Sequence, residues 1–94
     1  MILRDGSRII VQGPITIANV VEIIEQGANL FDRTDLIIDL AQVTEVDSSA
    51  VSMLLEWQRK ALENNQRLCF SNISENLKNL TQLYGVSELV PLAY

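Results

Sequence analysis

The chain has 94 residues, a length typical of one domain, and 48% of them are hydrophobic, which is enough for a packed core. Its net charge of −5 argues against nucleic-acid and anionic-membrane partners, because both bind basic patches. Histidine is absent, so the chain lacks the usual general base at neutral pH and the commonest metal ligand. Cys69 is the only cysteine, and no signal peptide or membrane-spanning apolar run is visible. The sequence predicts one cytoplasmic domain over residues 1–94, without catalysis, metal or cofactor.

The first elements are expected to be a hairpin. Two short apolar runs, residues 2–4 and 8–12, flank Asp5-Gly6, a strong turn signal between strands. Gly13-Pro14 is then expected to end the second strand.

A first helix is predicted after this hairpin. Thr16 is a candidate cap, and the apolar residues that follow have helical spacing: Ile17, Val20, Val21, Ile24 and Ala28. Gly27 fits the left-handed residue that commonly stops a helix.

The middle of the chain predicts a buried strand over residues 36–40, a loop over residues 41–46 and a second helix over residues 49–64. The predicted inner face of that helix consists of Val51, Leu54, Leu55, Gln58 and Leu62, with Met53, Trp57 and Ala61 beside it. The flanking position of Trp57 favours the edge of the core over a binding site.

The last third predicts a buried strand over residues 68–70 and a third helix capped by Ser74 and ended by Gly85. The inward residues of this helix are expected to be Leu77, Leu80, Leu83 and Tyr84. Residues 89–94 are a candidate edge strand. The resulting order, β-β-α-β-α-β-α, predicts an α/β fold with a mixed four- to five-stranded sheet and helices mainly on one face.

The segment Asp47-Ser48-Ser49 lies where a strand gives way to the second helix. Unpaired N–H groups and the positive end of the helix dipole lie at such a junction. The Ser48 hydroxyl therefore has three open interpretations, which are a helix N-cap, a contact with a protein partner and a phosphoacceptor. Asp47 is interpreted as a second capping group that also orients Ser48.

This junction resembles the STAS domains, the sulfate-transporter and anti-sigma-factor-antagonist family, and the order of elements extends the resemblance over the whole chain. Three stretches are most similar to the stand-alone STAS subunits of the Mla phospholipid-transport ABC complex: residues 13–16, 46–57 and 76–86. In the anti-sigma-antagonist branch glycine usually follows the second hydroxyl, whereas this chain has Ala50, which favours the transporter branch.

The resemblance implies a non-catalytic accessory subunit that binds the ATPase of the transporter, without inserting in the membrane, and lies in the cytoplasm at the inner membrane through that complex. It implies that the regulatory hydroxyl is Ser48. The partner surface is expected to comprise Asp47, Ser48, Ser49, Ser52 and Glu56. The alternative is an anti-sigma-factor antagonist that binds a kinase and is switched by phosphorylation of Ser48. A third alternative, a small hydrolase built on Asp39, Asp47 and Ser48, lacks a histidine base.

Overall fold

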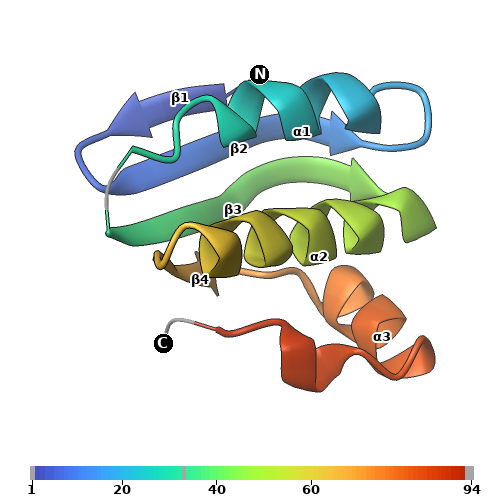
Figure 1. Cartoon of the computed structure of the whole chain (residues 1–94). Helices are drawn as coiled ribbons and strands as arrows, with labels where there is room; N and C mark the ends of the chain where they lie inside the picture. Colours follow the sequence, from blue (N-terminus) through green and yellow to red (C-terminus); the bar gives the residue numbers. More distant parts are fainter. Residues whose placement is uncertain (1, 33, 93–94) are drawn as a thin grey trace.

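A computed structural model describes residues 2–32 and 34–92 of the chain. A four-stranded sheet has the strand order β1-β2-β3-β4, in which β1 pairs antiparallel with β2 and the other neighbours pair in parallel. The helices α1 and α2 lie against one face of this sheet (Figure 1). The predicted α/β fold with a mixed sheet is confirmed. The elements are β1 (Ile2–Asp5), β2 (Arg8–Ile15), α1 (Val20–Ala28), β3 (Asp35–Val46), α2 (Ser48–Glu63), β4 (Arg67–Ser71), α3 (Glu75–Leu83) and the 3-10 helix η1 (Ser87–Leu89).

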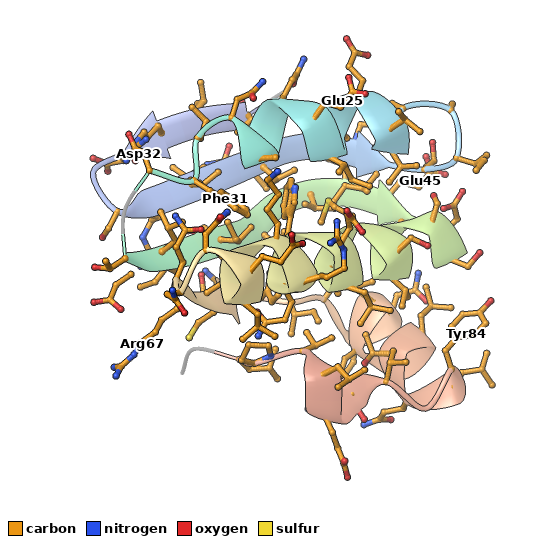
Figure 2. All side chains as sticks on the ribbon, in the orientation of Figure 1. Glu25, Phe31, Asp32, Glu45, Arg67 and Tyr84 are labelled. Atoms are coloured by element: carbon orange, nitrogen blue, oxygen red, sulfur yellow. The ribbon has the colours of Figure 1, made fainter. Side chains whose placement is uncertain are left out.

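The parallel strands give the molecule two distinct ends. All three α-helices begin after the carboxyl end of a parallel strand, so their first turns lie at one end of the sheet, which we call the carboxyl end. Figure 2 shows Glu45 and Tyr84 at this end, and Asp32 and Arg67 at the opposite end.

The strands β2 and β3 are longer than predicted. The β2 strand continues through Gly13-Pro14, and residues 41–46 are strand rather than loop. Ile10 pairs with Asp39 and Ile15 with Val46, so β3 holds two more residues than β2 over the paired stretch. Register shifts accommodate the two extra residues of β3, as β-bulges do. They allow the strand pairing to continue across Pro14 and across Gly13, whose backbone is left-handed (φ 85°).

The first helix starts later than predicted. It begins at Val20, and a turn precedes it in which the N–H of Val20 donates to the carbonyl of Thr16 over 2.9 Å. Asn19 holds the turn, since its side-chain oxygen accepts from the Thr16 N–H. Ile17 therefore lies outside the helix with 79% of its surface exposed, and Val21 is 66% exposed. Both residues belong to the apolar spacing that predicted this helix, but the structure buries neither of them.

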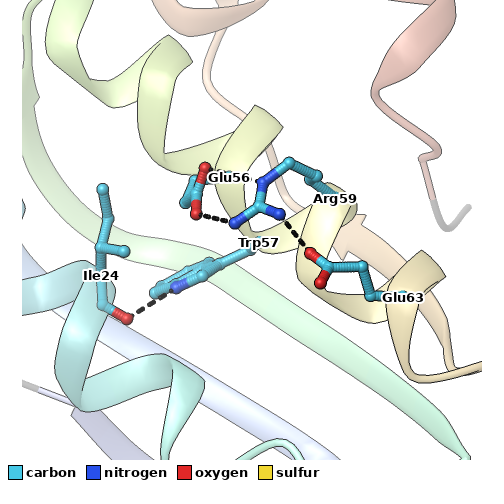
Figure 3. Close-up of polar contacts among 5 residues, drawn as sticks. All are labelled: Ile24, Glu56, Trp57, Arg59 and Glu63. Carbon is cyan, nitrogen blue, oxygen red and sulfur yellow. Dashed lines mark hydrogen bonds and ion pairs between the residues drawn. The ribbon is translucent and has the colours of Figure 1, made fainter.

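The contact between α1 and α2 is built around Trp57, which is fully buried and lies at the centre of the core rather than at its edge. Its indole N–H donates to the carbonyl of Ile24 over 3.1 Å (Figure 3), and its ring meets that of Phe31 edge to face. Gly27 lies within α1 and faces the same indole, where a Cβ would come within 2.2 Å of the ring. Gly27 therefore permits close packing of α1 against α2. The prediction that Gly27 stops the helix is wrong, because the helix continues to Ala28.

The buried faces of α2 and α3 differ in part from the predicted ones. In α2 the buried residues are Ser49, Ala50, Val51, Met53, Leu54, Trp57 and Ala61. Leu62, predicted to face inward, is 66% exposed. In α3 the capping role of Ser74 and the left-handed Gly85 are confirmed, but Leu83 and Tyr84 are exposed.

The C-terminal segment does not form the predicted fifth strand within the described residues. It forms η1 and then a single bridge between Phe70 and Leu92, with the Phe70 N–H donating to the carbonyl of Pro91. Residues 93–94, the end of that predicted strand, lie outside the described residues. No helix within residues 2–32 and 34–92 has the length and apolar character needed to cross a membrane.

Candidate functional site

The segment Asp47-Ser48-Ser49 lies at the carboxyl end of the sheet, between β3 and α2 (Figure 1). The β3 strand ends at Val46, Asp47 has extended backbone geometry, and α2 begins at Ser48. The positive end of the α2 dipole therefore meets the solvent beside this segment.

Asp47 is the N-cap of α2 and joins two elements. One carboxylate oxygen accepts from the N–H of Ser49 over 2.8 Å and from the Ser49 hydroxyl, and the other accepts from the N–H of Ile17 over 3.0 Å. These hydrogen bonds, the Ser49 hydroxyl foremost, lower the pKa of the Asp47 carboxyl. Asp47 is thus an anion whose two oxygens are both engaged, and it fixes the turn before α1 against the start of α2.

The two serines have opposite environments. Ser49 is buried, with 9% of its surface exposed, and its hydroxyl is bonded to Asp47. Ser48 is exposed on the first turn of α2. The N-cap interpretation of Ser48 is wrong because Asp47 holds that position, and a partner contact and phosphorylation are the two remaining interpretations.

The exposed side of α2 forms a hollow next to Ser48. Ser52 follows one turn later, and both serines line a hollow of about 320 Å³ together with Tyr84 and Val86 from the end of α3. The other lining residues are Val51 and Leu55. The site thus combines two hydroxyls with an apolar recess, an arrangement suited to a protein contact rather than to chemistry on a small substrate.

Glu56, the last predicted site residue, does not line this hollow. Arg59 donates to Glu56 and also forms an ion pair with Glu63 (Figure 3). The hydrogen bond from the Arg59 guanidinium lowers the pKa of Glu56, and the Glu56 carboxylate in turn raises the pKa of Arg59. Glu56 therefore belongs to an ion-pair network along α2.

Asp39 is not part of the site at Asp47. It accepts from the side chains of Arg8 (2.9 Å) and Asn72 (3.0 Å) and from the N–H of Ala41, and the Asn72 bond is the main cause of its lowered pKa. Eight residue steps separate Asp39 from Asp47 along β3 and its end, which at about 3.3 Å a step corresponds to roughly 26 Å of strand. The structure therefore does not bring together the acid pair of the hydrolase hypothesis. Within the described residues, no group of three or more Cys, Asp or Glu side chains is arranged to hold a metal ion.

Sequence reasoning missed the apolar residues around this site. Ile17 is bonded to Asp47 through its backbone, and Tyr84 lines the hollow beside Ser48. Both residues continue the helical spacing of apolar residues in a neighbouring predicted helix, so the sequence-based prediction grouped them with the buried face of that helix. Only the position of each helix end distinguishes them from core residues, and helix ends are the least reliable part of a sequence-based prediction.

The family model described as "Mlab, STAS domain" matches residues 2–91. The chain belongs to the STAS family. It is a domain of the Mlab type, and STAS domains of this type are generally non-catalytic. No curated protein sequence matches the chain significantly.

Three solved structures show the same fold at low identity. A chain of the Acinetobacter MlaFEDB complex in an ATP-bound conformation is 23% identical with a TM-score of 0.79, and the match covers 94% of this chain and 95% of that one. The unphosphorylated anti-sigma factor antagonist SpoIIAA is 19% identical with a TM-score of 0.74, covering 100% and 87% of the two chains. Phosphorylated SpoIIAA from Bacillus is 19% identical with a TM-score of 0.68, covering 100% and 90%.

Proposed function

We propose that this STAS domain is a non-catalytic accessory subunit of a bacterial phospholipid-transporting ABC complex that maintains outer-membrane lipid asymmetry. It binds the ATPase subunit and supports its activity, and it is held at the cytoplasmic side of the inner membrane through that complex. The match to the Mlab model over residues 2–91 and the likeness to a chain of the MlaFEDB complex support this assignment.

The observation that supports the proposed docking surface is that Asp47, and not Ser48, caps α2. Because Asp47 caps α2 and bonds Ser49, the helix start is complete without the Ser48 side chain. Ser48 and Ser52 are then exposed on successive turns beside the hollow at Tyr84. The docking surface is the first half of α2, with Ser48 and Ser52 in direct contact with the partner and Asp47 and Ser49 positioning them. Glu56 lies at its margin.

A second candidate function is that of an anti-sigma-factor antagonist that binds a kinase and is phosphorylated on Ser48. The chain shares its fold with SpoIIAA, which has been solved in phosphorylated and unphosphorylated forms. Ala50 is fully buried, so its Cβ faces the core and does not obstruct a contact at Ser48. Ala50 therefore does not disfavour this branch.

The test compares folding with binding in Ser48→Glu. In the free protein the acidic side chain lies at a positive helix end, so the melting temperature should stay close to that of wild type. In the complex an unpaired charge on a close-packed surface costs about 2–5 kcal/mol, so co-purification with the ATPase subunit should be lost. Ser7→Glu, an exposed serine at the opposite end, is the matched control and should bind normally.

Two results decide between the candidates. If Ser48→Glu co-purifies with the ATPase like wild type, Ser48 lies outside the interface and the docking surface is refuted. If the wild-type chain instead binds an anti-sigma kinase and gains a phosphate on Ser48, the antagonist function replaces the transporter assignment.

A further inference from the structure

Apolar side chains are exposed on both sides of the first turn of α2. Ile17 (79% exposed) and Val21 (66%) lie on the α1 side, and Leu83 (77%) and Tyr84 (54%) lie at the end of α3. The Ile17 N–H is bonded to Asp47, and Tyr84 shares a hollow with Ser48, so both groups adjoin the same turn. Exposed apolar patches that are rimmed by polar residues typically mark sites of protein association.

The same end of the molecule has an acidic rim. Glu22 lies in the first turn of α1, Glu75 in the first turn of α3, and Glu45 near the end of β3, and all three are exposed. Ser74 and Asn76, on either side of Glu75, line one hollow with Glu45, so the start of α3 adjoins the end of β3.

Most of the described basic residues lie elsewhere. Five of them are in elements or element halves towards the opposite end, namely the hairpin, the start of β4 and the second half of α2: Arg4, Arg8, Arg59, Lys60 and Arg67. Arg4, Arg8 and Arg59 form ion pairs with acids other than those of the rim. Of the described basic residues, only Lys78 lies in α3. The carboxyl end is therefore apolar at its centre and negative at its edge.

We propose that this surface recognises a protein partner that presents an apolar side chain surrounded by lysine or arginine. The inference rests on the proposed function and specifies the chemistry of the partner's contact. Ile17 and Tyr84 are the apolar anchors on either side of Ser48, and Glu22, Glu45 and Glu75 attract the basic ring. A bilayer with anionic headgroups does not fit, because the acidic rim repels it.

The experiment measures the dissociation constant for the purified ATPase subunit at low and at physiological salt. Ile17→Ser removes an anchor and should weaken binding about tenfold or more, because large side chains in the centre of an interface dominate its affinity. Leu62→Ser removes a leucine that is similarly exposed near the end of α2, and its binding should stay within about twofold of wild type, as is usual for surface changes outside an interface.

Charge reversal tests the rim separately. Glu45→Lys should weaken binding at low salt by about three- to tenfold, with a smaller effect at physiological salt, because salt screens charges across an interface. Glu63→Lys, which changes an exposed acid near the end of α2, is the control and should have no such effect.

The outcomes separate this inference from the function on which it rests. If Ser48→Glu abolishes binding while Ile17→Ser and Glu45→Lys bind normally, the docking surface stands and the proposed partner chemistry is wrong. If the wild-type chain does not bind the ATPase subunit at all, the proposed function and the proposed partner chemistry are both refuted. If wild type binds vesicles of phosphatidylglycerol and Ile17→Ser does not, the apolar patch is a membrane contact and the inference is overturned.

Discussion

Replacing Gly27 by alanine is predicted to destabilise the protein, although glycine-to-alanine changes inside helices usually stabilise. Gly27 lies within α1 and faces the buried indole of Trp57. An added Cβ would lie 2.2 Å from one ring carbon and 2.7 Å from another, far inside the normal contact of about 3.5–4.0 Å. Either α1 must move away from α2, or the indole must turn and weaken its hydrogen bond to Ile24.

Opposing terms set the size of the effect. Alanine gains about 1 kcal/mol of helix propensity over glycine. Overpacking costs about 1–3 kcal/mol, and losing the hydrogen bond of Trp57 adds about 1 kcal/mol. The net loss is about 1–3 kcal/mol, and for a domain of this size each kcal/mol lowers the melting temperature by about 4–8 °C.

The assay is thermal and urea denaturation of Gly27→Ala, with Gln26→Ala as the neighbouring exposed control. The same change in a Trp57→Leu background should be neutral or stabilising, because the ring that obstructs the methyl group is gone. This double-mutant cycle assigns the cost to the contact of Gly27 with Trp57. A melting temperature for Gly27→Ala above that of wild type would refute the close packing of α1 against α2.

The other predictions concern packing and pH. Leu54→Ala should cost about 2–5 kcal/mol because Leu54 is fully buried, whereas Leu62→Ala, on the exposed side of the same helix, should cost less than about 0.5 kcal/mol in urea denaturation. The pKa of Asp39 is lowered in the folded state, so its carboxylate stabilises the fold above its unfolded pKa, and this contribution is lost as the pH falls through the folded pKa. The melting temperature of Asp39→Asn should therefore lie below that of wild type at pH 7, and the difference should shrink below about pH 4, near the pKa of an unperturbed aspartate. A difference that is constant between pH 7 and pH 3 would contradict this ionic role.

The fold was predictable from sequence because its strongest signals are local. Asp5-Gly6 identified the hairpin, Ser74 and Gly85 marked the limits of α3, and the apolar run at residues 36–40 identified the central strand. The extension of β3 over residues 41–46 was missed because register shifts disturb the alternation of side chains along it.

The site was only partly predictable, because two neighbouring residues were both good caps. Asp47 and Ser48 each prefer the N-cap position, and sequence alone does not choose between them. The structure assigns the cap to Asp47 because its second oxygen also accepts from Ile17, a contact across 30 residues of sequence. The apolar periods around Ile17 and Tyr84 likewise continued past the true helix ends, so anchors of the proposed surface were assigned to the core.

The most direct test of the account is to locate the ATPase subunit on α2. A photo-crosslinking amino acid is introduced at Ser52 in one variant and at Lys60 in another, both exposed on the same helix two turns apart. Each variant is illuminated in the presence of the purified ATPase subunit, and the covalent product is identified by mass spectrometry. The account predicts a crosslink to the ATPase from position 52 and little or none from position 60. A crosslink from position 60 alone would place the partner on the other half of α2 and contradict docking at Ser48.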